Sequence, residues 1–171
     1  MFEKGGYIVY GTTGVCEIQD ITPLKMRDVP GDRLYYVLTP CFQKGNTIFT
    51  PVDNEKVPLR AVMSKEEASA LIDGIPGIEE LWEKDDKLRE KRYKEAIRSC
   101  DPREWIRIIK TSYLRQQERK AQGKKVTTVD ERYFRSAEDH LYSELSISLE
   151  IPKEEVKKYI QERMKRAEAL V

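Results

Sequence analysis

Histidine is almost absent from this sequence, and other residues that usually build catalytic or metal sites are sparse. The chain has a single histidine, His140, and three widely spaced cysteines without a CxxC pair. Glycine-rich phosphate loops and the HExxH and GxSxG motifs do not occur. His140 lacks the partners of a ligand or general base, which favours a packing or surface hydrogen-bonding role. The sequence therefore predicts a protein that is not an enzyme and that uses no metal, cofactor or small-molecule substrate.

Long apolar runs are also missing. No stretch of about eighteen apolar residues occurs, so we expect no transmembrane helix and no membrane partner. The first residues place an acid and a lysine before a strand, which differs from the basic and then apolar layout of a signal peptide. Reduced thiols at Cys16, Cys41 and Cys100 are the simplest interpretation, and they favour a cytoplasmic location.

Charged residues are abundant but unevenly distributed. Residues 1–83 contain 8 Lys or Arg and 13 Asp or Glu, and residues 127–171 contain 8 and 10. The block between them, residues 84–126, contains 15 basic and 7 acidic residues. Such a block favours a positive surface that attracts polyanions. An ordinary solvated helical face has the same composition, so both interpretations stay open.

The first sixty residues have the pattern of short β-strands. Within Lys4–Ile21, two β-branched and aromatic runs flank a Gly-Thr-Thr-Gly turn, which predicts a hairpin. Arg33–Leu38 is apolar on both faces, as in a central strand, and Thr47–Thr50 forms another strand that stops at Pro51. Four or five short strands over about sixty residues are typical of a small barrel or rolled sheet.

From Ser64 onward the pattern is helical. Ser64–Glu67 has the form of a capping box, and a break at residues 73–77 is the expected hinge. Further helices are predicted to begin near Asp101, Thr128 and Pro152. Together the patterns predict an α+β protein. Its parts are a small β-barrel module in residues 1–60, a connecting helix and hinge in residues 61–77, and an all-helical bundle in residues 78–171.

Four residues in or near the basic block have more than one interpretation. Asp85 and Asp86 are adjacent, and adjacent residues point in different directions on a helix, so an N-cap is preferred to a pair of catalytic carboxylates. Trp105 has the spacing of a core residue. Trp82 lies between a weakly apolar segment and the basic block, and its environment stays open.

Several motifs, taken in order, resemble the CarD/CdnL family of bacterial transcription regulators. The resemblance extends from residue 2 to about residue 149. Its first half consists of Gly6-Tyr7-Ile8-Val9-Tyr10, Gly14-Val15, Tyr35-Tyr36-Val37-Leu38 and Thr47-Ile48-Phe49-Thr50-Pro51. Its second half consists of Lys91-Arg92-Tyr93-Lys94, Leu114-Arg115-Gln116-Gln117-Glu118-Arg119 and the segment from Glu131-Arg132 to Glu144-Leu145.

This resemblance implies a Tudor-like RNA polymerase interaction domain joined to a helical DNA-contacting domain. In the family, the β-module binds the polymerase β subunit, and the helical domain contacts the upstream edge of the promoter bubble and stabilises the open complex. Two positions depart from the family pattern. Arg89 stands where relatives have a tryptophan that wedges into the minor groove, and Phe49 stands where some relatives have an arginine.

The resemblance and the basic block together give candidate sites. Polymerase contact is predicted through edge-strand pairing, at Thr47, Ile48, Phe49, Thr50 and Pro51. Contact with promoter DNA, at its minor groove or backbone, is predicted for Arg89, Lys91, Arg92, Lys94, Arg115, Arg119 and Arg132. The alternative is an adaptor that binds polymerase or another protein without touching DNA. The replaced tryptophan favours this alternative, and the basic block opposes it.

Overall fold

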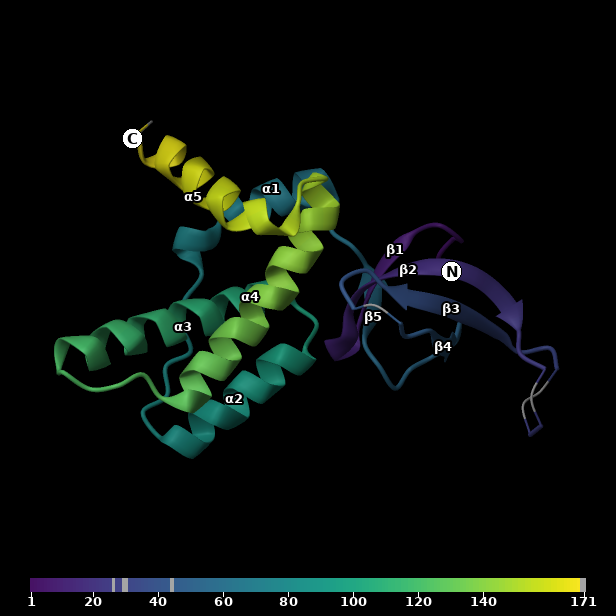
Figure 1. Cartoon of the computed structure of the whole chain (residues 1–171), viewed down its shortest axis with the longest axis horizontal. Helices are drawn as coiled ribbons and strands as arrows, with labels where there is room; N and C mark the ends of the chain where they lie inside the picture. Colours follow the sequence, from purple (N-terminus) through teal and green to yellow (C-terminus); the bar gives the residue numbers. More distant parts are fainter. Residues whose placement is uncertain (26, 29–30, 44, 170–171) are drawn as a thin grey trace. The chain divides into compact units, whose positions relative to one another are not determined.

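The chain forms two compact units, which are described separately. The computed structural model describes residues 1–25, 27–28, 31–43 and 45–169 (Figure 1). The β-unit comprises Met1–Val62, and the helical unit comprises Met63–Val171. An antiparallel sheet followed by helices confirms the predicted α+β class.

The β-unit is one five-stranded antiparallel sheet in the order β4-β3-β2-β1-β5. Its strands are β1 (Tyr7–Tyr10), β2 (Gly14–Pro23), β3 (Leu34–Pro40), β4 (Ile48–Pro51) and β5 (Leu59–Ala61). As its apolar pattern predicts, β3 is an interior strand between β2 and β4, although β2 occupies the middle of the sheet. The Thr47–Thr50 segment becomes an outer strand, because β4 pairs with β3 alone in the described chain.

The predicted hairpin turn is a single turn of 3-10 helix, η1 (Gly11–Thr13). Gly11 has a φ of 47°, and a Cβ at this position would lie only 2.6 Å from Cγ1 of Val57. Only glycine combines this backbone conformation with so close a neighbour. After this turn, β2 pairs with β1 in a register that places Ile8 opposite Cys16. Both side chains belong to the core.

The hydrophobic cluster of the β-unit lies on one face of the sheet, and Val9 and Val15 are buried on the other face. The fully buried members of the cluster are Ile8, Cys16, Ile18, Tyr36 and Leu38. Burial raises the pKa of Cys16 to about 12, with a smaller contribution from nearby Cys41. The pKa of Cys41 itself is raised to about 11, again mainly by burial. Both groups therefore stay protonated at neutral pH, as expected for reduced thiols that pack like small apolar residues.

The helical unit contains five α-helices and one short 3-10 turn in the described residues. They are α1 (Lys65–Asp73), η2 (Ile75–Gly77), α2 (Asp86–Arg98), α3 (Pro102–Ala121), α4 (Thr128–Leu149) and α5 (Lys153–Ala169). Side chains of Ser64, Asp85, Asp101 and Thr127 accept backbone hydrogen bonds at the first four α-helix starts. The predicted starts at Ser64 and Asp101 are confirmed, as is the N-cap role in the aspartate pair, which falls to Asp85.

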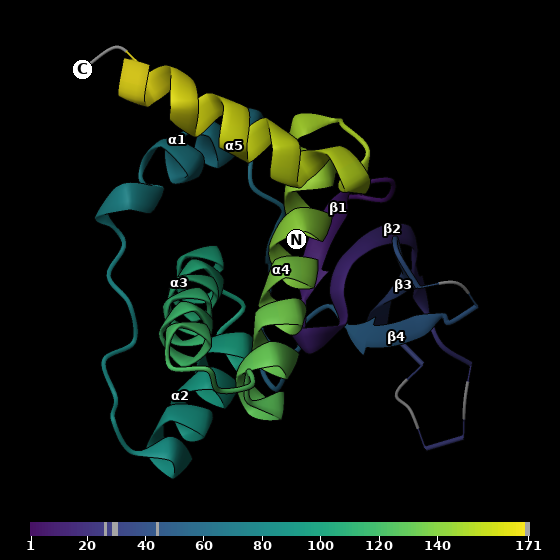
Figure 2. The ribbon, with the colours of Figure 1, turned by 60° about the vertical axis from the view of Figure 1, so that its left-hand side comes forward.

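Helix α4 is the centre of the helical unit. It packs against α1, α2, α3 and α5 (Figure 2). Its buried residues Ala137, Leu141 and Leu145 recur at four-residue intervals, which is the spacing of one helix face. The sequence pattern predicted this apolar face correctly.

Helix α1 belongs to the helical unit, whereas we expected residues 61–77 to connect two domains. The boundary lies between Val62 and Met63, because α1 packs against α4 and α5. Leu71 and Ile72 of α1 are buried. At the end of α1, the Asp73 carboxylate accepts two hydrogen bonds from Arg163 of α5, at 2.7 and 2.8 Å.

Within the described ranges, no helix is both long and apolar enough to cross a membrane. The same residues contain no group of three or more His, Cys, Asp or Glu side chains placed to hold a metal ion.

Candidate functional site

One side of α2 presents a row of basic side chains to solvent, which we call the α2 stripe. It consists of Lys87, Lys91, Lys94 and Arg98, all exposed. Spacings of four, three and four residues place these side chains within about 60° of one another around a helix of 3.6 residues per turn. The opposite side of α2 is buried and carries Tyr93 and Ala96. The sequence therefore sorts cations outward and apolar residues inward on this helix.

Lys91 and Arg92, both predicted to contact DNA, differ in their surroundings. Lys91 is exposed and has no ion-pair partner in the part of the chain that the structure describes. Arg92 is about half exposed, and its Nη2 lies 3.7 Å from the carboxylate of Glu83. Its Nη1 donates to the backbone carbonyl of Trp82 at 3.3 Å. Lys91 is thus available to a partner, whereas Arg92 would have to exchange surface contacts.

Lys94 and Arg132 share one carboxylate. Glu90 lies 3.8 Å from the Lys94 ammonium and 3.2 Å from the Arg132 guanidinium, so it links α2 to α4. The guanidinium of Arg132 also lies 5.0 Å from the centre of the Tyr133 ring. All of these cations are more than half exposed. Exposed ion pairs of this kind contribute little to stability and can be exchanged for other anions.

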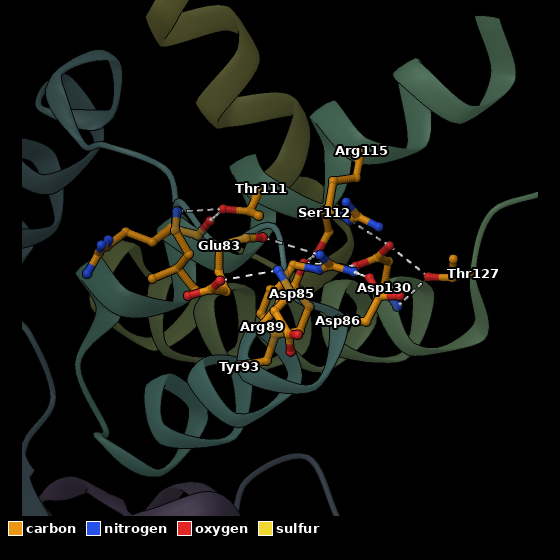
Figure 3. A network of polar contacts seen from close by, with 12 residues as sticks. Glu83, Asp85, Asp86, Arg89, Tyr93, Thr111, Ser112, Arg115, Thr127 and Asp130 are labelled. Atoms are coloured by element: carbon orange, nitrogen blue, oxygen red, sulfur yellow. Dashed lines mark hydrogen bonds and ion pairs between the residues drawn. The ribbon is translucent and has the colours of Figure 1, made fainter. Parts of the chain in front are cut away.

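Arg89 is internal, although the prediction of a DNA contact assumed a surface side chain. Its side chain is only 5% exposed. Nη2 lies 2.6 Å from Asp86, Nη1 donates to the Glu83 carbonyl at 3.3 Å, and Nε lies 3.7 Å from Asp130 (Figure 3). Arg89 shares the buried side of α2 with Tyr93, because the two are four residues apart. A guanidinium held in this way is not presented at the surface for insertion into a minor groove.

The carboxylate at the centre of this network is Asp130 of α4, which is 1% exposed. It accepts hydrogen bonds from the Tyr93 hydroxyl at 2.9 Å, from Thr127 Oγ1 at 2.7 Å and from Arg115 Nε at 3.0 Å (Figure 3). A buried carboxylate is tolerated only when it is paired and hydrogen-bonded in this way. Sequence reasoning placed Asp130 in the first turn of a helix and missed its role in joining α2, α3 and α4.

Tyr93 is a fixed donor in this network. Burial raises its pKa to about 12, and the charge of Asp130 acts in the same direction. The hydroxyl therefore keeps its proton and donates to Asp130 throughout the physiological range. Its oxygen also lies 3.4 Å from the Ser112 hydroxyl of α3. The aromatic residue beside Lys91 and Arg92 is thus part of the core and not a surface for stacking bases.

The two predicted arginines of α3 each use a single nitrogen in their contacts with the described part of the chain. Nε of Arg115 donates to Asp130 at 3.0 Å, and Nε of Arg119 donates to the Lys125 carbonyl at 2.6 Å. Their terminal nitrogens make no hydrogen bond or ion pair to other described residues. Both side chains are partly exposed, so four N–H-bearing nitrogens remain for a partner.

The two tryptophans occupy opposite environments. Trp105 is 1% exposed, and its ring stacks on His140 with centroids 5.4 Å apart, which confirms the predicted core position. Trp82 is 75% exposed. It borders a pocket of about 320 Å³ together with Leu81 and Leu114. The structure thus resolves the environment that the sequence left open, and Trp82 lies on the surface.

The residues predicted to contact polymerase lie at one edge of the sheet. Val52 N–H donates to the Leu34 carbonyl at 3.1 Å, which makes these residues a hydrogen-bonded pair at the end of the β3–β4 ladder. Bonded and non-bonded pairs alternate in an antiparallel ladder, so the backbone groups of Phe49 and Pro51 face away from β3. The Phe49 side chain is 51% exposed, whereas Thr50 is 2% exposed. Ile48 packs on the core and Thr47 is exposed.

Two family models match this chain. The CarD-like/TRCF RID domain matches residues 2–63, and the CarD C-terminal domain matches residues 78–161. The chain belongs to the CarD-like family. The resemblance inferred from the ordered motifs is therefore confirmed. No individual curated protein matches the sequence.

Membership of the CarD-like family indicates the general function of the chain. CarD-like domains indicate a family of transcription regulators that interact with RNA polymerase and that are not enzymes. The two matched regions correspond to the β-unit and to the helices from residue 78 onward. Residues 64–77, which form α1 and η2, lie outside both matches although α1 packs within the helical unit.

Proposed function

We propose that this CarD-like protein binds the RNA polymerase β subunit through its β-unit and promoter DNA through the α2 stripe, and that it stabilises the open complex. The observation that carries the proposal is the stripe itself. It places Lys87, Lys91, Lys94 and Arg98 along one exposed side of a single helix. A solvated helical face usually mixes both signs of charge, whereas this row contains cations alone.

The polymerase half of the proposal rests on the outer strand β4. The N–H and carbonyl of Phe49 face away from β3, as does the carbonyl of Pro51, so a partner strand has backbone groups to pair with. The exposed Phe49 side chain adds apolar area beside this edge. Pro51 has no N–H, which limits the length of the added ladder.

A pair of substitutions at Phe49 tests this contact in the full-length chain. The Phe49 N–H faces outward, so Phe49→Pro removes an edge donor without removing a hydrogen bond to β3. Phe49→Ala keeps the donor and removes the ring. We expect Phe49→Pro to reduce co-purification with the β subunit more than Phe49→Ala, with both proteins folded by circular dichroism. Equal retention of wild type and Phe49→Pro would rule out pairing at this edge.

The DNA half of the proposal rests on phosphate contacts. Lysine is a compact point charge that binds phosphate without reading bases, so the α2 stripe is suited to hold a duplex regardless of sequence. Contacts with four phosphates would release counterions and give a slope of about −3.6 in log K against log salt. Tyr93 and Arg89 are buried and contribute no base contact.

Neutralisation of two stripe lysines tests the DNA contact. In a retardation assay with promoter DNA, Lys91→Gln with Lys94→Gln should weaken binding and lower the magnitude of the salt slope by about 2. The matched control is Lys157→Gln with Lys165→Gln, which removes the same charge from exposed positions on α5. If the two double variants bind equally at low salt, the stripe is only a solvated face.

The alternative, an adaptor that does not touch DNA, is favoured by one observation. Most of the cations predicted to contact DNA already have partners within the chain, namely Arg89, Arg92, Lys94, Arg115, Arg119 and Arg132. The same assay with duplex and fork-shaped promoter DNA separates the two functions. Retention on polymerase together with no shift of either DNA would establish the adaptor, and a shift of either DNA would exclude it.

A further inference from the structure

A small pocket in the helical unit gathers more positive charge than its internal contacts require. It has a volume of about 210 Å³ and lies between the start of α2, the second half of α3 and the start of α4. We call it the arginine pocket. The lining residues that matter here are Asp86, Lys87, Arg89, Arg115, Arg119 and Thr127.

The hydrogen-bond donors of the three arginines are only partly used inside the protein. Arg89 uses Nε and Nη1 for Asp130 and the Glu83 carbonyl, and its Nη2 faces Asp86. In their contacts with the described residues, Arg115 and Arg119 use Nε alone. Asp130 already accepts bonds from Tyr93, Thr127 and Arg115, so it has little capacity left. Glu90 also lines the pocket, but its carboxylate pairs with Lys94 and Arg132. Of the carboxylates in the pocket wall, that of Asp86 is the one bonded to a terminal nitrogen of these three arginines among the described residues.

Asp86 differs from the structural acid Asp130 in its exposure. Its side chain is 86% exposed, although its Oδ1 lies 2.6 Å from Nη2 of the buried Arg89. The hydrogen bond from Arg89 and the charge of that guanidinium lower the pKa of Asp86, and the charges of Arg115 and Arg119 lower it further. Asp86 is also not the N-cap of α2, because Asp85 accepts the capping hydrogen bond from Leu88 N–H. Its carboxylate can leave the arginines without uncapping the helix.

We propose that the arginine pocket binds one phosphate group of the DNA backbone and that Asp86 occupies this site in the free protein as an internal competitor. The proposal rests on the proposed DNA binding and extends it to a defined site. A backbone phosphate presents two charged non-bridging oxygens, and arginine forks match them bidentately. On binding, Asp86 turns to solvent, and the phosphate takes Nη2 of Arg89 with terminal nitrogens of Arg115 and Arg119.

This site places the α2 stripe and the pocket on one path for a nucleic-acid strand. Lys87 belongs to both, since it is the first residue of the stripe and lines the pocket. A strand whose phosphates follow the stripe therefore reaches the pocket at the N-terminal end of α2. Here Arg89, which is too buried to enter a groove, contacts DNA through a single phosphate.

Removal of the competitor tests the proposal in the full-length protein. Asp86→Asn keeps the side-chain shape and should tighten binding to promoter DNA by about ten-fold, the scale of one charge-assisted hydrogen bond made available. The matched control is Glu95→Gln, which removes the same charge from an exposed position of α2 outside the pocket. Equal gains in DNA affinity for Asp86→Asn and Glu95→Gln would show that the change in net charge explains the effect, and this would overturn the proposal.

A double-mutant cycle ties the gain to the pocket. Arg119→Gln should weaken DNA binding, and in its presence Asp86→Asn should lose most of its advantage. Additive effects of the two substitutions would overturn the proposal. Thermal unfolding of each variant verifies that the helical unit is folded. Wild-type protein that binds no DNA at all contradicts the proposed function, whereas normal wild-type binding with no gain for Asp86→Asn contradicts only the pocket.

Free anions provide the other arm of the test. Inorganic phosphate and pyrophosphate should bind Asp86→Asn only weakly, because a lone anion lacks the further contacts along the stripe. NMR of the arginine side-chain N–H groups would follow this binding, with Arg119 as reporter. If pyrophosphate binds the pocket as tightly as promoter DNA does, the ligand is a free anion and the assignment to the DNA backbone is wrong.

Discussion

Trp105 and Trp82 show how far the environment of one residue type differs within the helical unit. Trp105 is 1% exposed and stacks on His140, whereas Trp82 is 75% exposed at the edge of a pocket. Burial of an aromatic ring is among the largest contributions that a single side chain makes to stability. The two tryptophans should therefore have separate roles, one in folding and one at the surface.

Substitution of each tryptophan should separate these roles. Trp105→Ala should lower the free energy of unfolding by about 3–5 kcal/mol, because it leaves a cavity in the core. Trp82→Ala should change it by no more than about 0.5 kcal/mol, as for most surface positions. Urea denaturation followed by circular dichroism measures both values. Similar losses for the two variants would show that Trp82 packs more extensively than its exposure indicates.

The stability of the helical unit should fall below neutral pH because of His140. Burial lowers the pKa of this imidazole, Asp139 acts in the opposite direction, and Lys153 reinforces the lowering. The unfolded chain thus binds the proton more readily, so the contribution is complete above the ordinary value of 6.5 and is lost as pH falls below it.

The unfolding free energy measured between pH 8 and pH 5 tests this dependence. His140→Phe keeps a ring against Trp105 but cannot titrate, so its stability should vary less with pH than that of the wild type over this range. The carboxylates titrate mostly below this range and affect both proteins alike. Parallel curves for the two proteins would exclude His140 as the source.

At the residue scale the sequence predicted the type of side chain better than its exposure. Lys91 lies on the surface as expected, whereas Arg89 does not. The signal for Arg89 was available, because it is four residues before Tyr93 and seven before Ala96, on the apolar side of the helix. The spacing of residues along α2 could not identify the acidic partner of Arg89. Asp130 is forty-one residues away in the chain and is brought close only by the packing of α4.

At the scale of elements, the C-terminus of α4 ends in a backbone conformation that is unfavourable for a residue with a Cβ atom. Glu150 caps this helix with a φ of 55°, in the left-handed region. Its N–H donates to the Ser146 carbonyl, and its side chain is exposed. Glycine adopts this conformation without the steric cost that a Cβ imposes.

Glu150→Gly should therefore raise the free energy of unfolding by about 0.5–1 kcal/mol, the difference between relief of left-handed strain and the added flexibility of the unfolded chain. Glu150→Ala is the control, since it removes the same carboxylate but keeps the Cβ, and it should bring no such gain. Thermal and urea unfolding measure both variants. Equal stabilities of the glycine and alanine variants would show that backbone strain is not the cause.

The starts of elements were predicted well, and their partners were not. Ser64, Asp85 and Asp101 act through local hydrogen bonds within three residues, so short sequence motifs suffice to find them. The assignment of α1 to the helical unit depends instead on Asp73 and Arg163, which are ninety residues apart. Contacts at such separations leave no local pattern, and for this reason residues 61–77 were expected to be only a connection.

At the scale of the whole molecule, the division between Val62 and Met63 predicts which fragments fold. A fragment of residues 63–171 should be more stable than one of residues 78–171 by about 3 kcal/mol or more, since the longer one keeps Leu71 and Ile72 buried. It also keeps the Asp73–Arg163 pair. Thermal unfolding of the two fragments provides the comparison. Equal melting temperatures of the two fragments would show that α1 adds no stability and only connects the two units.

The length of the α2 stripe limits the footprint that the proposed DNA contact could have. From Lys87 to Arg98 the helix advances eleven residues, or about 16 Å at 1.5 Å per residue. Laid along a duplex, this distance spans about five base pairs, roughly half a turn. Under the proposed function, so short a footprint would hold one point of a promoter, and the affinity for any longer stretch would have to come from the polymerase.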